Sequence, residues 1–121
     1  MTTVDTNILI DALRGMPEAV RYLSETNRQF AVSAVSITEL YAGLRGSNER
    51  NELQTFLKSF TIHIVDESIA ILAGQYMNRF AKSHDLGIAD ALIGATATNF
   101  NEELATLNTK HFPMLTAIRP Y

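Results

Sequence analysis

The chain has 121 residues, of which 46% are hydrophobic and 19% are charged, and its formal net charge is −3. This length and composition are typical of a globular protein, so we predict one domain over residues 1–121. The absence of cysteine excludes disulfide bonds, thiolate metal sites and a cysteine nucleophile. The negative net charge excludes binding of nucleic acid through a general positive field. No leader-like or membrane-spanning segment is evident, so we expect a cytoplasmic location without membrane contact.

Short strand patterns alternate with helical patterns along the chain. In chain order we predict a strand at Thr2–Asp5, helices at Asn7–Leu13 and Pro17–Ser24, a strand at Phe30–Ser33, helices at Ser36–Leu44 and Glu49–Phe60, a strand at Thr61–Val65, helices at Glu67–Lys82 and Ile88–Asn99, and strands at Leu104–Leu107 and Thr116–Ile118. Strands separated by helices favour parallel pairing, so the expected fold class is α/β. Ligands of such sheets bind beyond the carboxyl ends of the strands.

Three acidic residues stand at predicted helix starts in apolar surroundings. Asp90 is the only charged residue of the Ile88–Asn99 helix, and a buried carboxylate is costly unless it is paired or binds a metal. A first-turn Asp that faces solvent is the structural alternative. Asp5 follows the first strand, where it is either a helix N-cap or an acid directed into the ligand crevice. Glu39 completes a capping-box pattern with Ser36, so it too has a structural interpretation.

The three acids gain meaning when they are considered together. Carboxylates that converge at one edge of a sheet repel one another unless a cation neutralises them. Oxygen ligands without cysteine or a histidine cluster suit Mg²⁺ or Mn²⁺ rather than zinc. Hard divalent cations held by carboxylates commonly serve phosphate chemistry.

The three histidines are not predicted to join this set. His63 alternates with Ile62 and Ile64, so we place it on the solvent face of its strand. His84 and His111 lie in polar segments without a partner at ligand spacing, and both are predicted to be surface residues. The chain also has no glycine-rich nucleotide-binding motif and no G-x-S-x-G motif, so neither chemistry has support.

Four blocks of the sequence together carry a resemblance to a known family. They are Val4–Asp11, Ser33–Gly43, Ile88–Ala97 and Leu104–Phe112, and they span nearly the whole chain. They resemble the PIN domain and, within that family, the short toxins of the VapC type. The resemblance implies a three-layer sandwich with a central parallel sheet flanked by helices. It also implies a small ribonuclease that is the toxin of a toxin–antitoxin pair.

The resemblance also assigns roles to single residues. Asp5 and Asp90 match the acids that bind Mg²⁺ or Mn²⁺, and Glu39 matches the acid that orients or deprotonates the attacking water. The fourth catalytic position, often Asp in this family, falls on Asn108, so the sequence leaves open whether one or two cations bind. The implied supporting residues are Thr6, Asn7 and Thr106.

The implied reaction is metal-dependent hydrolysis of phosphodiester bonds in RNA such as tRNA. The implied partners are a VapB-type antitoxin and a second copy of the chain, with apolar helical surface around Ile69–Phe80 as the candidate dimer interface. Five cationic side chains are candidates for holding the RNA backbone, namely Arg14, Arg45, Arg50, Lys82 and Lys110.

Two alternatives stay open at this point. A PIN fold without catalytic activity would bind RNA or protein only, and the departure at Asn108 is the reason to consider it. A phosphoacceptor receiver domain has a similar length and α/β class. Its Asp…Asp…Lys order is roughly matched by Asp5, Asp66 and Lys110, although Asp66 is also a simple helix N-cap.

Overall fold

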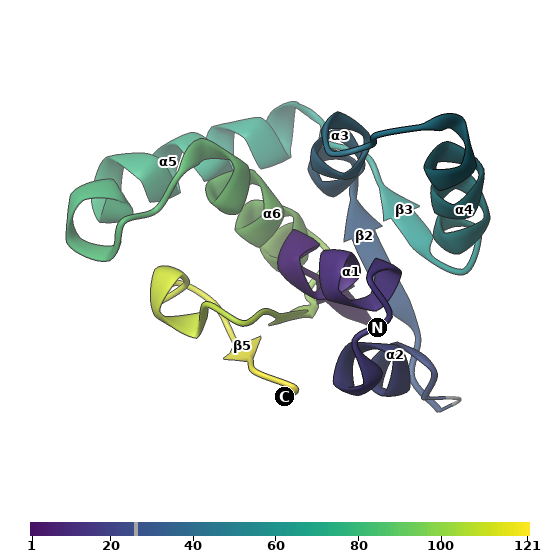
Figure 1. Cartoon of the computed structure of the whole chain (residues 1–121). Helices are drawn as coiled ribbons and strands as arrows, with labels where there is room; N and C mark the ends of the chain where they lie inside the picture. Colours follow the sequence, from purple (N-terminus) through teal and green to yellow (C-terminus); the bar gives the residue numbers. More distant parts are fainter. Residues whose placement is uncertain (26) are drawn as a thin grey trace.

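The structure, a computed structural model, describes residues 1–25 and 27–121 and contains one five-stranded parallel sheet (Figure 1). The strands follow the order β3-β2-β1-β4-β5 across the sheet, and all neighbouring pairs are parallel. Their bounds are β1 (Thr2–Val4), β2 (Phe30–Ser33), β3 (Thr61–His63), β4 (Glu103–Ala105) and β5 (Ala117–Ile118). β1 is therefore central, and Asp5 follows it directly.

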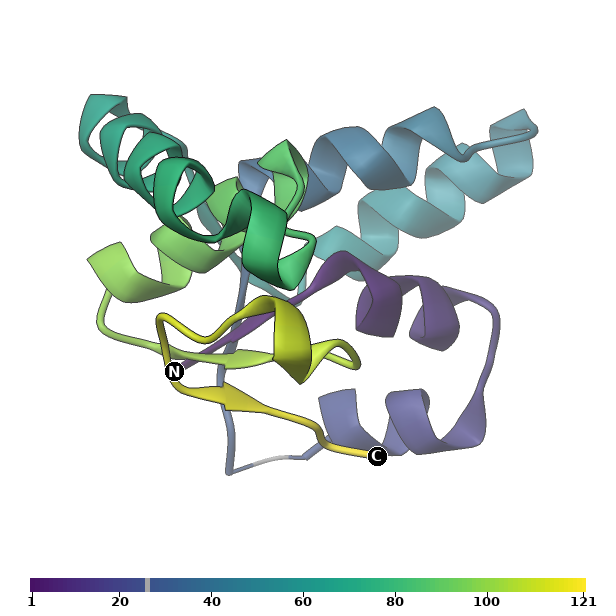
Figure 2. The same cartoon turned by 90° about the vertical axis from the view of Figure 1, so that its left-hand side faces the viewer.

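Helices cover both faces of this sheet (Figures 1 and 2). They are α1 (Thr6–Leu13), α2 (Pro17–Leu23), α3 (Ala34–Ala42), α4 (Ser47–Leu57), α5 (Glu67–His84) and α6 (Ile88–Asn99), with a short 3₁₀ helix, η1 (Thr109–His111). One core packs α1 to α4 against the sheet and includes Val4, Leu9, Tyr22, Val32, Leu40 and Leu53. The other packs α5 and α6 against the opposite face and includes Ile69, Ile93, Leu104 and Phe112. The expected α/β class and three-layer arrangement are confirmed.

The sheet order also decides against the receiver alternative, which is wrong for this chain. Receiver domains have the strand order 2-1-3-4-5, whereas here β2 lies between β3 and β1. Asp66 is the N-cap of α5, and its side chain accepts a hydrogen bond from the Ile69 N–H at 3.0 Å. Its capping function therefore accounts for this residue.

Most predicted elements are present with ends that differ by a few residues, but the start of α3 changes an interpretation. α3 begins at Ala34 rather than Ser36, and its N-cap is Ser33, which accepts a hydrogen bond from the Val35 N–H at 3.2 Å. Ser36 is buried inside the helix, so the predicted capping box between Ser36 and Glu39 does not form. Both serines are good caps, and the end of β2 at Ser33 decides between them.

The prediction for His63 was wrong. His63 is buried, and its Nε2 lies 3.0 Å from a carboxylate oxygen of Glu102, while its ring stacks on Phe100 with 3.6 Å between the centroids. Ile62 and Ile64 are exposed instead. The alternation of residue types around β3 correctly predicted that His63 and its isoleucine neighbours lie on opposite faces of the strand. It did not predict which of the two faces is buried.

α5 packs along α6 (Figure 1), so the helix proposed as a dimer surface is only partly available. Ile69 and Ala73 are buried in the core, whereas Ile71 on the same helix is 55% exposed. In the part of the chain that the structure describes, no helix is both long and apolar enough to cross a membrane.

Candidate active site

Asp5 lies at the carboxyl end of the central strand and is almost fully buried, with 4% of its surface exposed. It is the N-cap of α1, because its Oδ1 accepts a hydrogen bond from the Thr6 N–H at 2.8 Å. Its Oδ2 accepts a second one from the Thr106 hydroxyl at 2.7 Å. Thr106 follows β4, which pairs with β1, so two neighbouring strand ends hold this carboxylate. Asp5 is thus the N-cap of α1, and its carboxylate is held at the carboxyl end of the sheet.

The buried position of Asp5 changes its acidity. Burial raises the pKa of Asp5 from 3.8 to about 6, while the hydrogen bonds from Thr106 and Thr6 act in the opposite direction. The negative charges of Asp90 and Glu39 are smaller contributions to the same rise. Asp90 and Glu39 therefore lie close enough to Asp5 to interact with it electrostatically, although Asp5 caps α1, Glu39 lies within α3 and Asp90 lies in the first turn of α6.

Glu39 is an exposed residue of α3, and its partner comes from α1. The Thr6 hydroxyl donates to Glu39 Oε1 at 2.6 Å and lies 2.8 Å from the Ser36 hydroxyl. Because Thr6 has a single hydroxyl proton, the Ser36 hydroxyl is the donor in the second contact. Thr6 thus links Glu39 to Asp5, because its hydroxyl binds Glu39 and its backbone N–H binds Asp5.

Asp90 lies in the first turn of α6, as expected, with 35% of its side chain exposed. Its neighbour is a residue that the sequence interpretation missed, because the Nδ1 of His111 lies 3.5 Å from Asp90 Oδ2. This Nδ1 is buried and has no hydrogen-bond partner among the described residues. The sequence offered one indication that His111 lies near the site, because it belongs to the same block as Asn108, Leu104–Phe112.

Asn108 and Asn7 occupy the remaining predicted positions. The backbone N–H of Asn108 donates to the Thr106 hydroxyl oxygen at 3.0 Å, while its side chain is exposed just before η1. Asn7 lies in the first turn of α1, and its Oδ1 is buried without a partner among residues 1–25 and 27–121. Hydrogen bonds therefore connect Glu39 through Thr6 to Asp5, and Asp5 through Thr106 to the backbone of Asn108.

The donor set at this site suits a hard divalent cation. It consists of carboxylates whose mutual repulsion a cation would offset. Among the described residues, no three His, Asp or Glu side chains already enclose a metal ion. Mg²⁺ needs no such cage, because it usually binds one or two carboxylates and keeps several waters. Asp5 and Asp90, with water completing the coordination, fit that requirement.

Comparisons with known proteins agree with this architecture. The PIN domain family matches residues 2–114 of the chain. Ribonuclease VapC10 of Mycobacterium tuberculosis is 41% identical over 123 residues, which cover 99% of this chain and 92% of that protein. Ribonuclease VapC19 of the same organism is 36% identical and covers 99% of this chain and 98% of its own length.

A solved structure described as a toxin–antitoxin complex from Klebsiella pneumoniae has the same fold. The similar chain in it superposes with a TM-score of 0.84 at 30% sequence identity. The match covers all of this chain and 98% of that chain.

Proposed function

Since this chain belongs to the PIN domain family, we propose that it is an endoribonuclease dependent on Mg²⁺ or Mn²⁺ and the toxin of a toxin–antitoxin pair. Relatives that match nearly the full length of the chain are named ribonucleases, which supports nuclease activity. A similar structure is a toxin–antitoxin complex, which supports a VapB-type antitoxin as partner. The observation that carries the proposal is the set of acids near the carboxyl end of β1, in which Thr6 connects Asp5 to Glu39 and Asp90 is close enough to raise the pKa of Asp5.

Each residue of the set has a task that follows from its surroundings. Asp5 and Asp90 would hold the cation, and the hydrogen bonds from Thr6 and Thr106 fix the Asp5 carboxylate in one orientation. When bound, the cation supplies a Lewis acid that activates water and polarises the scissile phosphate. Glu39 is more exposed than Asp5, so it is accessible to substrate and can orient an attacking water or accept its proton.

The surrounding amides and hydroxyls complete the proposed site. The Thr6 hydroxyl keeps Glu39 directed toward Asp5, because it donates to Glu39 at 2.6 Å. Asn108 stands at the end of the Thr106 hydrogen-bond chain, where a neutral amide orients water without adding negative charge. The buried Oδ1 of Asn7 accepts no hydrogen bond from the described residues, and an internal water would satisfy it.

The remaining parts of the proposal concern the setting of the reaction. We propose structured RNA such as tRNA as substrate, a homodimer as the assembly and the cytoplasm as the location. Ile71 on α5 is an exposed apolar side chain available to a dimer interface.

Cleavage by the purified, antitoxin-free protein tests the function. Labelled tRNA and rRNA fragments are incubated with Mg²⁺ or Mn²⁺, with EDTA, and with the variants Asp5→Asn, Glu39→Gln and Asp90→Asn. We expect cleavage only by the wild-type protein with metal, since each variant removes one carboxylate. Thermal unfolding shows whether the variants are folded. Cleavage that persists in EDTA or in Asp90→Asn contradicts the proposed mechanism.

The inactive binding module is the second candidate, and the neutral Asn108 is the observation that favours it. It predicts that folded wild-type protein cuts none of these RNAs with either metal. Under that candidate Asn108→Asp, which restores the acid common in the family, is the variant expected to gain cleavage.

A further inference from the structure

Asp90 differs from the other two acids of the site in how its carboxylate is held. Asp5 accepts hydrogen bonds from Thr6 and Thr106, and Glu39 accepts one from Thr6. In the part of the chain that the structure describes, the only polar side chain in contact with the Asp90 carboxylate is an imidazole, whose Nδ1 lies 3.5 Å from Oδ2. Any side chain that orients Asp90 is therefore to be sought there.

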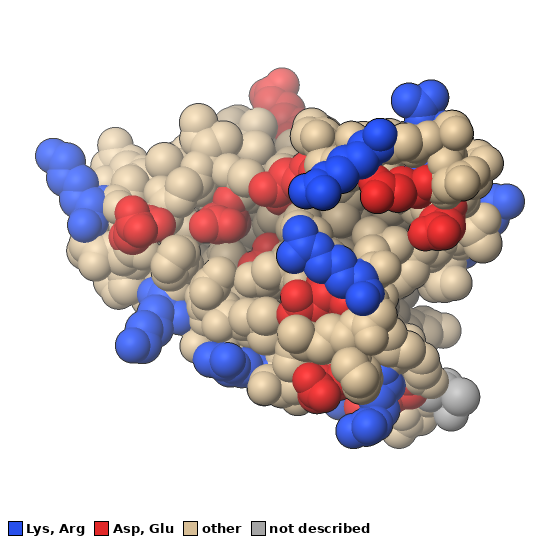
Figure 3. Space-filling model, in the orientation of Figure 1, with Lys and Arg blue, Asp and Glu red and all other residues tan. Residues whose placement is uncertain are grey.

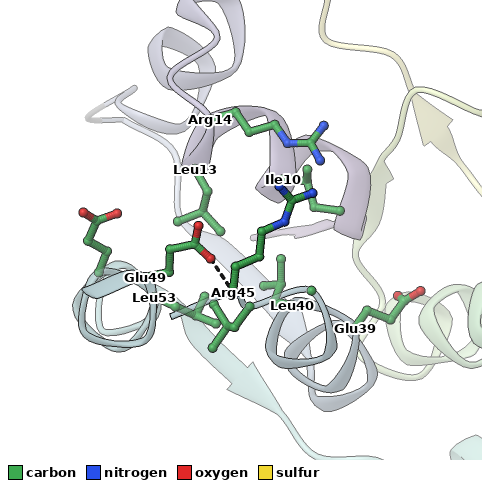
Figure 4. A pocket seen from close by; sticks show the side chains of 11 residues that line it. Ile10, Leu13, Arg14, Glu39, Leu40, Arg45, Glu49 and Leu53 are labelled. Atoms are coloured by element: carbon green, nitrogen blue, oxygen red, sulfur yellow. Dashed lines mark hydrogen bonds between the residues drawn. The ribbon is translucent and has the colours of Figure 1, made fainter. Parts of the chain in front are cut away.

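The cationic side chains of this face do not serve Asp90. Lys and Arg side chains lie beside acidic ones in Figure 3, but among the described residues the salt bridges of Lys and Arg all involve Arg28. Arg14 and Arg45 extend over the apolar hollow between α1, α3 and α4 (Figure 4), and Asp90 does not line that hollow. The neighbour of Asp90 is the imidazole of His111.

The segment that carries His111 packs tightly on the helix that carries Asp90. Phe112 is almost fully buried, and a Cβ at Gly94 would lie 3.2 Å from its ring, so a side chain there would have to displace it. Gly94 follows Asp90 by four residues, which places the two on one face of α6. The His111 N–H also donates to the Asn108 carbonyl at 3.0 Å. The imidazole is thus held beside Asp90 by the packing of its own backbone.

The Nδ1 atom of His111 is buried and has no hydrogen-bond partner among the described residues. A buried N–H without an acceptor is unfavourable, and Asp90 Oδ2 is the acceptor beside it. The separation exceeds the usual range of an N–H···O hydrogen bond by only about 0.3 Å. Because the Asp90 side chain is 35% exposed, it has room to move this far. Hydrogen bonds at catalytic sites are often long until metal and substrate are bound.

We propose that His111 is the positioning residue of Asp90. Its neutral imidazole carries the proton on Nδ1 and donates a hydrogen bond to Asp90 Oδ2, which leaves Oδ1 for the cation. A neutral imidazole has a single N–H, so Nε2 is then an acceptor. Partners of this kind fix the orientation of carboxylates that bind metals. The inference rests on the proposed function, because that function makes Asp90 a cation ligand.

Histidine ¹⁵N NMR of the metal-free protein tests the contact without any cleavage assay. The spectrum of a neutral imidazole distinguishes a proton on Nδ1 from one on Nε2. We expect His111 to carry it on Nδ1 in the wild type and to lose this preference in Asp90→Ala. The signals of His84 are the internal control, because its Nδ1 lies 2.7 Å from the Ser83 hydroxyl and should not respond. A wild-type His111 protonated on Nε2 overturns the inference.

Mn²⁺ binding, measured by calorimetry without RNA, is the second test. His111→Ala should weaken the affinity about 10-fold to 100-fold. His111→Asn should restore most of it, because the amide nitrogen of Asn is as many bonds from the backbone as Nδ1. In His111→Gln the amide nitrogen corresponds to Nε2, so the affinity should stay low. His84→Ala is the matched control, since His84 lines the same hollow as His111 without contacting an acid of the site.

Cleavage kinetics separate positioning from a direct part in the reaction. At saturating Mn²⁺, His111→Ala should regain most of kcat with an unchanged KM for RNA, because the cation then occupies the site in spite of the lost hydrogen bond. A low kcat at saturating Mn²⁺ in both His111→Ala and His111→Asn would show that the imidazole acts on the reacting atoms. That result overturns the positioning role.

The outcomes separate this inference from the proposed function. The expected NMR and Mn²⁺ results without cleavage by the wild type support the inference and overturn the nuclease. If the wild type cleaves RNA but the three His111 variants lose Mn²⁺ affinity equally, or not at all, the inference is wrong and the nuclease stands. A wild type that binds no Mn²⁺ overturns both. Thermal unfolding shows whether each variant is folded, and the NMR comparison decides the contact even if His111→Ala is not.

Discussion

The hydroxyl of Thr106 donates to Asp5 Oδ2 at 2.7 Å, across 101 positions of sequence. The contact exists because β1 and β4 pair in parallel, with Val4 opposite Ala105. Asp5 and Thr106, the residues that follow these two strands, therefore leave the sheet side by side. It stabilises the ionised form of the most buried acid of the site, since a hydrogen bond to a carboxylate lowers its pKa. Thr106 is therefore a positioning residue in the proposed mechanism.

Thr106→Val removes this hydrogen bond and nearly preserves the side-chain shape. We expect the pKa of Asp5 to rise further, so that at neutral pH more of the protein carries a neutral Asp5. The affinity for Mn²⁺, measured by calorimetry, should fall about 10-fold to 100-fold, as is usual when a partner of a metal-binding carboxylate is removed.

The pH dependence distinguishes this effect from simple loss of structure. The deficit in Mn²⁺ affinity should shrink as the pH is raised, because a higher pH restores the ionised Asp5. Thr106→Ser, which keeps the hydroxyl, should behave like the wild type. A deficit that is the same at every pH would contradict the explanation through Asp5.

The raised pKa of Asp5 also predicts how the stability of the metal-free protein varies with pH. The folded state holds the Asp5 proton up to about pH 6, whereas an unfolded chain releases it near 3.8. Between these values the folded state binds more protons, so the contribution of Asp5 to stability falls as the pH rises. Above about pH 6 the difference corresponds to about 3 kcal/mol of destabilisation.

Asp5→Asn removes this ionisation and should stabilise the protein in EDTA at about pH 8 by up to about 3 kcal/mol, with little effect near pH 4. Urea unfolding of both proteins across this range measures the difference, and other titrating groups cancel in the comparison. With saturating Mg²⁺ the order should reverse, because only the wild type gains free energy from binding the cation. A pH-independent difference would argue against a raised pKa.

The buried pair of His63 and Glu102 is predicted to be a major source of stability. Their side chains are only 8% and 9% exposed, and Glu102 also accepts a hydrogen bond from the Thr3 hydroxyl at 2.8 Å. Glu102→Ala leaves two buried polar groups without their partner, so we expect a loss of about 3 kcal/mol in urea unfolding.

An exposed ion pair provides the control for this experiment. Glu25 pairs with Arg28 at 3.0 Å, but both side chains are more than a third exposed. Glu25→Ala should therefore change the free energy of unfolding by less than about 1 kcal/mol. Equal losses in the two variants would show that burial of the His63 pair has no special importance.

Two helical glycines should respond in opposite ways to a larger side chain. A Cβ at Gly94 would lie 3.2 Å from side-chain atoms of Phe112 and Leu115, in the segment that carries His111. A Cβ at Gly74 on α5 would have no atom within 4 Å. We expect Gly94→Val to destabilise the protein by about 1–3 kcal/mol through overpacking. Gly74→Ala should stabilise it by about 1 kcal/mol through helix propensity.

Thermal unfolding with both variants checks this contrast. Gly94→Val should also lower nuclease activity if displacement of Phe112 moves His111 away from Asp90. Stabilisation by both substitutions would mean that the C-terminal segment packs on α6 less closely than the structure indicates.

Local patterns in the sequence were enough to predict the elements and the fold class. The apolar run that makes α6, the Asp66 cap of α5 and the strand at Phe30–Ser33 all depend on neighbouring residues, and such short-range preferences are visible without the fold. The acids were predictable as candidates for the same reason, because each is an unusual charge beside a strand end or in an apolar helix. Their catalytic roles are proposals that the cleavage experiment tests.

The contacts that connect those acids were decided only by the tertiary structure. The pairing of β1 with β4 brings Thr106 to Asp5, and the packing of α1 against α3 brings Thr6 to Glu39. The same holds for His63, because alternation shows that an edge strand has two faces and only helix packing decides which face is buried. The sequence thus determined which residues can form elements and carry charge, whereas long-range packing decided which of them meet.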